Sequence, residues 1–330
     1  MIEHRAVVIG LGVGLITVPR TVRSQPRKSA RIGWVGRWYS QAAGTSLFDA
    51  FRQGMRELGY VEGQNVAIET RWLEGIASPR EEAAKATADL ARSKIDVFVA
   101  QGPAVDGVKA EAGSVPVVFV YSGDPVEAKL VASLARPGGN LTGMTVFGVD
   151  LAGKQLELLK EALPRISRVG VLVNPLHIGE YPEFERLQSV AQRLAIKLQH
   201  ATVRTIPEVN AALETMARER VQALMVFPNL VTMHQRYTIA DFAAKHRIPA
   251  ISGWEDFAVD GNLMTYGPDL REAWRYVATY VDKILKGARP ADLPVEQPTR
   301  LQFVINLKAA KALGVTIPPS LMARADRLLE

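Results

Sequence analysis

The chain has 330 residues, a length typical of two domains, and its composition of 48% hydrophobic and 22% charged residues excludes an intrinsically disordered chain. The formal net charge of +6 is not concentrated in a block of lysines and arginines, which argues against nucleic acid as a partner. There is no cysteine, so disulfides, thiolate metal sites, cysteine nucleophiles and a lipid anchor on an N-terminal cysteine are excluded.

The first 25 residues predict export. Arg5 precedes an apolar run over residues 6–18, which is too short for a bilayer span of roughly 20 residues. A basic flank, a short apolar core and then a polar segment are typical of a secretory signal peptide, and Ser24 is a small residue suited to the cleavage site. A buried first strand is the alternative. No other stretch is apolar enough to span a membrane, so we expect residues 1–25 to be removed and a soluble protein in the periplasm.

Strands and helices alternate through the first half of the chain. Short apolar runs predict strands, and apolar residues at helical spacing predict helices. In chain order we expect a strand at 31–36, a helix at 45–58, a strand at 66–72, a helix at 78–93, a strand at 95–100 followed by a short helix, a strand at 117–120, a helix at 126–134 and a strand at 141–146.

The alternation restarts at residue 151. We expect a helix at 151–163, a strand at 168–173, a helix at 182–194, a strand at 197–203, a helix at 207–218, a strand at 223–227, a helix at 232–246, strands at 249–252 and 263–266, a helix at 270–286, a strand at 301–307 and a helical tail.

Repeated strand–helix alternation predicts parallel sheets with both faces covered by helices. We therefore predict an α/β protein of two doubly wound parallel-sheet lobes joined by hinge strands. The strands at 141–146 and 263–266 are the expected crossings. The N-terminal lobe is expected to comprise residues 30–145 plus 267–300, and the C-terminal lobe residues 146–266 plus 301–330.

Six loops follow predicted strands and combine small or polar residues with a helix start. Backbone N–H groups at helix N-termini suit a carboxylate or another anion, and small residues let the backbone approach it. Each loop alone is also explained by a plain turn or a helix cap. Because all six loops follow strands in the same way, and occur in both halves of the chain, together they favour a ligand cleft between lobes. The loops contain Trp38, Tyr39 and Ser40; Gly102, Pro103 and Ala104; Ser122 and Asp124; Asn174; Asn229; and Trp254 and Glu255.

Aromatic side chains gather near the same loops. A ring there could sandwich a flat ligand or stack on a cation, and a rim or packing role is the alternative for each. Asp124 and Glu255 could accept an ammonium group; an Asx turn at Asp124 and a cap or solvated acid at Glu255 are the alternatives. Tyr121, Thr145 and Tyr266 complete the expected ligand-binding set, and Phe257 is a further aromatic near it.

No catalytic signature is present in the sequence. The five histidines show no metal-ligand spacing, and the glycine-rich residues 10–14 lie in the export segment, where they follow no strand. There is no Gly-x-Ser-x-Gly elbow and no carboxylate pair suited to acid–base work. We expect no catalytic residue, no metal and no cofactor.

Several motifs resemble one known family, the ABC-transporter substrate-binding proteins that include tryptophan- and tyrosine-binding members. The likeness runs from about residue 30 to the end of the chain. It rests on GMRELGYVEGQN at residues 54–65, GDPV at 123–126, SLARPGGNLTG at 133–143, LKGARPADLPVEQPT at 285–299 and VINLKAAKALG at 304–314. Jointly these motifs are highly specific.

The resemblance implies a type I periplasmic-binding-protein fold with two α/β lobes, three crossing strands and a closing cleft. It implies export, a small organic ligand such as an aromatic or other amino acid or an aromatic acid, and delivery of that ligand to an ABC permease by a monomer. Members often have Gly-Thr-Pro-Ala where this chain has residues 101–104, so one hydroxyl contact to an amino-acid carboxylate is missing here. A ligand sensor acting on a membrane receptor and a two-lobed enzyme are the alternatives.

Overall fold

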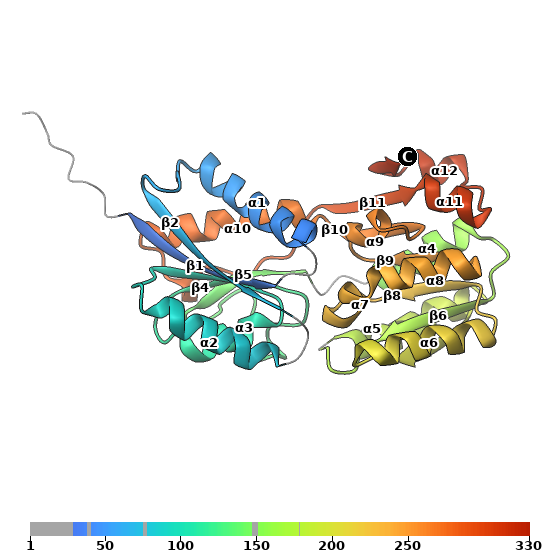
Figure 1. Ribbon diagram of the computed structural model, residues 1–330, viewed down its shortest axis with the longest axis horizontal. Helices are drawn as coiled ribbons and strands as arrows, with labels where there is room; N and C mark the ends of the chain where they lie inside the picture. The colour runs from blue at the N-terminus through green and yellow to red at the C-terminus, as the bar shows by residue number, and fades with distance from the viewer. Residues whose placement is uncertain (1–28, 38–40, 75–77, 147–150, 178) are drawn as a thin grey trace, which may run out of the picture.

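A computed structural model describes residues 29–37, 41–74, 78–146, 151–177 and 179–330. Two β-sheets lie side by side along the long axis of the molecule, each with helices on both faces (Figure 1). We call the part built on the five-stranded sheet the first lobe and the part built on the seven-stranded sheet the second lobe. Within the described residues, none of the helices combines the length and the apolar composition needed to cross a membrane.

The sheet of the first lobe is wholly parallel, in the order β2-β1-β3-β4-β5. Its elements are β1 (Ala30–Arg37), α1 (Gln41–Glu57), β2 (Val66–Leu73), α2 (Pro79–Ala91), β3 (Val97–Gln101), α3 (Ala104–Glu111), β4 (Val117–Tyr121), β5 (Leu141–Thr145) and, from much later in the chain, α10 (Leu270–Leu285) and the 3₁₀ helix η1 (Pro290–Asp292). Phe51 of α1 and Trp274 of α10 pack on one face of the sheet, and Leu90 of α2 and Val108 of α3 pack on the other.

The second lobe carries strands in the order β12-β11-β10-β9-β8-β6-β7, all parallel except for the antiparallel pair β10–β11. Its elements are α4 (Leu151–Ala162), β6 (Arg168–Val173), α5 (Glu180–Arg193), β7 (Lys197–Thr202), α6 (Ile206–Arg218), β8 (Ala223–Val226), α7 (Leu230–His234), α8 (Arg236–His246), β9 (Ala250–Ser252), α9 (Glu255–Val259), β10 (Met264–Pro268), β11 (Leu301–Asn306), α11 (Leu307–Leu313), α12 (Pro319–Met322) and β12 (Arg327–Leu329). Helices α4, α5, α11 and α12 cover one face of the sheet, and α6 to α9 cover the other.

Three segments of chain connect the lobes. The first follows β5, the second joins β10 to α10, and the third runs from η1 to β11. The first and third segments are paired, because Thr145 N–H donates to the carbonyl of Glu296 over 3.0 Å. The second and third are also neighbours, because Asp269 N–H donates to the carbonyl of Arg300 over 3.3 Å. The lobes are therefore joined through one bundle of adjacent crossings.

Several sequence expectations differ from the structure. The helix expected at 232–246 is two helices, α7 and α8, and the expected parallel sheets include the antiparallel pair β10–β11. Residues 126–134 form turns rather than a helix, because Lys129 adopts a left-handed φ of 55° and ends the coil after about one turn. The next residues, Leu130 and Val131, are both buried in the core beside α3. The end of the chain is also not wholly helical, since β12 adds a parallel strand to β11.

Candidate functional site

The carboxyl ends of the strands in both sheets face a cleft between the lobes. Loops at this edge of a parallel sheet are where open α/β folds hold small ligands. The cleft contains two adjoining spaces, which share Ser122, Val146 and Trp254 in their walls. They enclose about 30 Å³ and 60 Å³, so the lobes are nearly closed on one another. A ligand as large as an amino acid must enter while the lobes are apart.

The smaller space, which we call the apolar chamber, is lined mainly by hydrocarbon and aromatic side chains. Leu47 and Trp274 approach it from helices of the first lobe, and Met233 and Trp254 from α7 and the start of α9 in the second lobe. Trp274 is held from behind by Trp34, with ring centroids 4.8 Å apart. The chamber therefore offers a rigid apolar surface drawn from both lobes.

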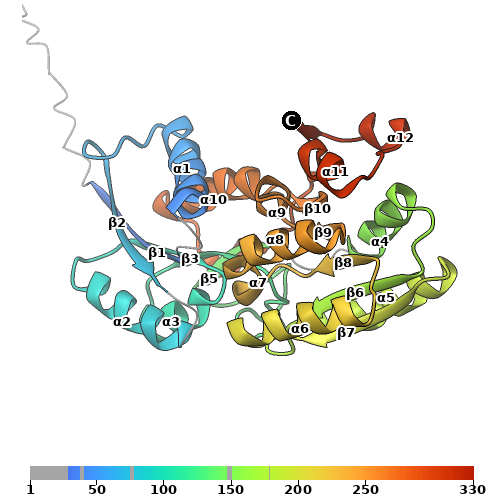
Figure 2. The same cartoon turned by 45° about the vertical axis from the view of Figure 1, so that its right-hand side comes forward.

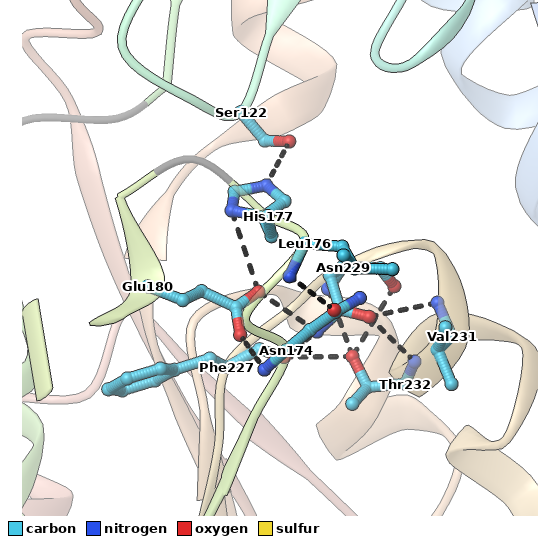
Figure 3. Close-up of polar contacts among 9 residues, drawn as sticks. All are labelled: Ser122, Asn174, Leu176, His177, Glu180, Phe227, Asn229, Val231 and Thr232. Atoms are coloured by element: carbon cyan, nitrogen blue, oxygen red, sulfur yellow. Dashed lines mark hydrogen bonds and ion pairs between the residues drawn. The ribbon is translucent and has the colours of Figure 1, made fainter. Parts of the chain in front are cut away.

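The other space, which we call the acidic chamber, is lined by His177, Glu180, Glu183 and Gln155 together with uncharged residues. Glu180 begins α5, and its side chain is only 3% exposed. One carboxyl oxygen, Oε2, accepts from the backbone N–H of Asn174 over 2.7 Å, and Oε1 accepts from Asn229 Nδ2 over 2.9 Å (Figure 3). Burial nevertheless raises the pKa of the Glu180 carboxyl well above its ordinary value, so the group favours its neutral form.

His177 connects this carboxyl to the opposite lobe. Its Nε2 lies 3.0 Å from Ser122 Oγ in the loop after β4, within hydrogen-bond distance, and its Nδ1 lies 3.6 Å from Glu180 Oε1 (Figure 3). Burial lowers the pKa of His177 to about 4, so the imidazole is neutral near pH 7. The side chain thus bridges the two lobes as a neutral hydrogen-bonding group.

The contacts from Ser122 to His177 and from His177 to Glu180 follow the serine–histidine–acid order of a serine hydrolase. The pKa values of the histidine and the acid do not suit that chemistry. A general base needs a pKa near the working pH, and a pKa of about 4 makes His177 a weak base. Burial also raises the pKa of the Glu180 carboxyl, which disfavours the charged form that would stabilise an imidazolium. No group of His, Cys, Asp and Glu side chains suited to a metal ion occurs among the residues that the structure describes.

The asparagines predicted at strand ends satisfy local backbone groups. Asn229 Oδ1 accepts from the N–H groups of Val231 and Thr232, which caps α7, while its Nδ2 donates to Glu180 (Figure 3). Asn174 Oδ1 accepts from the N–H of Leu176 over 2.9 Å. Both side chains are therefore hydrogen-bonded to neighbouring protein groups next to the acidic chamber and do not point into its empty space.

Of the other predicted residues, the structure brings Gly102, Ser122 and Trp254 to the cleft wall. Two predicted acids are engaged elsewhere. Asp124 Oδ1 accepts from the N–H groups of Val126 and Glu127, which is the Asx-type cap of the next turn. Glu255 forms an ion pair with Arg327 beside a different surface hollow. Both acids therefore have structural partners.

The remaining predicted residues lie in or near the protein core. Tyr121 is buried, which raises its pKa to about 12. Thr145 Oγ1 donates to the carbonyl of Gly123 over 2.9 Å, and Tyr266 packs edge-on against Phe303. The last group contains Pro103 and Ala104, where α3 begins, and the fully buried Phe257. Trp38, Tyr39 and Ser40 lie outside the described residues.

Sequence reasoning missed several residues of the cleft. The sequence shows no metal-ligand spacing for His177, Glu180 precedes the helix expected at 182–194, and Met233 and Trp274 fall in expected helices without a ligand role. A signal was available for the first two. His177 and Glu180 lie three and six residues after Asn174, in a strand-end loop and at the start of the helix that follows it. Met233 and Trp274 reach the cleft only through tertiary packing.

A larger cavity lies elsewhere, with about 420 Å³ between α1, α10 and residues 296–300. Four of its charged groups form ion pairs: Arg275 with Glu57 over 2.7 Å and Arg300 with Glu272 over 3.1 Å. It lies beside the crossing segments rather than at the strand-end loops. We therefore place the candidate ligand site in the cleft.

Comparison with known proteins decides the family. The family described as ABC transporter substrate binding protein matches residues 40–329. The chain belongs to this family. A tyrosine-binding protein of Clostridioides difficile (strain R20291) is 24% identical over 267 residues, which cover 80% of this chain and 75% of that protein.

Solved members of the same architecture confirm the two-lobed type I periplasmic-binding-protein fold. An ABC domain from Streptococcus pneumoniae, solved in complex with L-Trp, matches 92% of this chain and 100% of its own at 25% identity and a TM-score of 0.82. A conserved domain protein from Vibrio cholerae matches 91% of this chain and 100% of its own at 27% identity and a TM-score of 0.82. The expected family and fold class are thus both confirmed.

Proposed function

We propose that this substrate-binding protein captures a small organic ligand between its lobes outside the cytoplasm and delivers it to an ABC permease. The observation that carries the proposal is the convergence of strand-end loops from both sheets on one cleft. Gly102, Ser122 and Trp254 are the sequence-predicted residues that we place against the ligand, together with residues 38–40.

The ligand that suits this cleft is an aromatic or other apolar amino acid. Trp254, Trp274 and Met233 offer an apolar surface for its side chain. Glu183 is a carboxyl group in the adjoining acidic chamber, and a ligand amine is the group it would bind. Relatives described as tyrosine-binding or solved with L-Trp support the same class. An aromatic acid without an amine is therefore the weaker candidate.

Capture would work by lobe closure. We assign residues 30–145 plus 267–300 to one rigid unit and 146–266 plus 301–330 to the other, joined by the crossing segments. A ligand that contacts both units favours the closed state, because only that state provides contacts from both sides. A monomer suffices for this cycle. Residues 1–25 would direct export to the periplasm and then be removed.

A thermal-shift screen tests ligand binding. At 100 times its dissociation constant, a ligand stabilises the folded state by about 2.7 kcal/mol, which corresponds to several degrees in Tm. We expect tryptophan, tyrosine or phenylalanine to raise the Tm, and 3-phenylpropionate, which lacks the amine of phenylalanine, to raise it less. Branched-chain amino acids test whether an aromatic ring is required.

Two variants control the screen. Trp254→Ala removes a shared wall of both chambers and should abolish the shift. Tyr181→Ala removes a 41%-exposed ring on α5 that lines neither chamber and should leave the shift intact. If no amino acid or aromatic acid changes the Tm of the unmodified chain, capture in the cleft is refuted.

A further inference from the structure

One side-chain hydrogen bond joins the lobes at the centre of the cleft. Ser122 follows β4 in the first lobe and His177 follows β6 in the second, and their Oγ and Nε2 atoms are 3.0 Å apart (Figure 3). Ser122 borders both chambers, and His177 lines the acidic one. Opening the lobes must break this contact.

The surroundings of His177 determine which protonation state this contact tolerates. The charged or titratable groups of the acidic chamber are His177 itself, Glu180 and Glu183. Every other lining residue, from α4, from the loops after β8 and β9 and from the first lobe, is uncharged. Burial raises the pKa of the Glu180 carboxyl well above its ordinary value, and its two oxygens already accept from Asn174 and Asn229, so it is a poor partner for an imidazolium. The loss of hydration on burial therefore dominates, and it disfavours the charged imidazole.

We propose that the Ser122–His177 hydrogen bond is a closure contact that favours a neutral imidazole, so that acidification shifts the cleft toward its open state and releases the ligand. The inference rests on the proposed function, because ligand release is its consequence. His177 acts as a positioning residue: it holds the lobes together around the ligand. A protonated imidazole could still donate to Ser122, but it would lose its hydration between the closed lobes. The open state restores that hydration.

The sign and size of the effect follow from linkage. In the closed state the pKa of His177 is about 4, and in the open state the hydrated side chain returns toward its ordinary value of 6.5. The open state therefore binds more protons between these values, and closure weakens as the pH falls from 6.5 to 4. Between pH 7.5 and pH 5.0 the closure equilibrium should fall about 30-fold, and the affinity for a ligand bound by the closed state should fall with it.

Calorimetric titration of the full chain with tryptophan and with tyrosine at pH 7.5, 6.0 and 5.0 tests the proposal. Both amino acids remain zwitterions over this range, so their own ionisation does not contribute. We expect the affinity to fall about 30-fold in the unmodified protein and to change less than threefold in His177→Gln, whose amide can still reach Ser122 but does not titrate. His246→Gln, at an exposed histidine of α8, should retain the full pH dependence.

Small-angle scattering separates failure of this inference from failure of the proposed function. With tryptophan at about ten times its dissociation constant at pH 7.5, acidification to pH 5.0 should enlarge the radius of gyration of the chain, with far-UV circular dichroism unchanged, and should not enlarge that of His177→Gln. Ligand affinity that is independent of pH, or equal pH slopes in the protein and in His177→Gln, would overturn the inference and leave the proposed function standing. If no amino acid binds at any pH, the proposed function fails, and the inference that rests on it fails with it.

Discussion

At the scale of single residues, the most consequential group is the carboxyl of Glu180. It is nearly inaccessible to solvent, and Asn174 and Asn229 donate to its two oxygens. No cation lines its chamber among the described residues. A raised pKa means that the folded chain holds a proton that the unfolded chain releases. The contribution of this carboxyl to stability should therefore fall as the pH rises above its ordinary value of 4.5.

The variant Glu180→Gln tests this prediction, because glutamine cannot ionise. We compare the variant with the wild type in urea at pH 4.5, 6.0 and 7.5. The variant's free energy of unfolding minus that of the wild type should increase with rising pH, by up to about 1.4 kcal/mol per pH unit, so the variant becomes relatively more stable. Glutamine has one carboxyl oxygen fewer to accept from Asn229 or Asn174. This loss should shift the variant's curve of stability against pH by a constant amount relative to the wild-type curve. Glu185→Gln, on the exposed face of α5, controls for removal of a charge. Parallel curves for Glu180→Gln and the wild type would contradict a neutral Glu180.

At the scale of elements, the position of strand β10 depends on a glycine, Gly267, which lets β10 lie close to its neighbour. A Cβ on Gly267 would lie 1.9 Å from the carbonyl oxygen of Gly253, which follows the neighbouring strand β9 and lines the acidic chamber. Backbone atoms cannot yield as the end of a flexible side chain can. Gly267→Ala should therefore push β10 away from β9 and destabilise the fold by about 1–3 kcal/mol in urea unfolding. Gly139→Ala, where a Cβ meets nothing within 4 Å, should change stability by no more than about 0.5 kcal/mol. Equal stabilities of the two variants would show that this close approach has no energetic role.

Local sequence patterns predicted most elements, because periodicity reports directly which face of a strand or helix is buried. They failed at residues 126–134, where a left-handed Lys129 lets consecutive apolar residues enter the core without a helix. For the candidate site, strand-end reasoning pointed to the edge of the sheets that faces the cleft, and Gly102, Ser122 and Trp254 line that cleft. It could not identify the Ser122–His177 contact, because the two residues are 55 positions apart and belong to different lobes.

At the scale of the whole molecule, the arrangement of the crossings favours a hinge. All three connections between the lobes run close together, through the pairing of Thr145 with Glu296 and of Asp269 with Arg300. Turned by 45°, the two lobes overlap in projection, with β2 and α2 of the first lobe on the left and β6 and α4 of the second on the right (Figure 2). Away from the crossings, hydrogen bonding between the lobes includes the Ser122–His177 contact. Rotation about the crossings could therefore separate the lobes while each sheet stays intact.

Fluorescence energy transfer can measure this rotation, because the chain contains no native cysteine to compete for the dyes. Glu111 at the end of α3 and Glu214 in α6 are exposed residues of opposite lobes, and a cysteine pair at these positions should show higher transfer efficiency when a ligand from the thermal-shift screen is added. A pair at Glu81 in α2 and Glu111 lies within the first lobe and should not respond, because each lobe moves as a rigid unit. Unchanged transfer in the inter-lobe pair, under conditions where the screen shows binding, would mean that the ligand enters without closure. A change in both pairs would instead place the motion inside the first lobe, and the division of the chain at the crossings would be wrong.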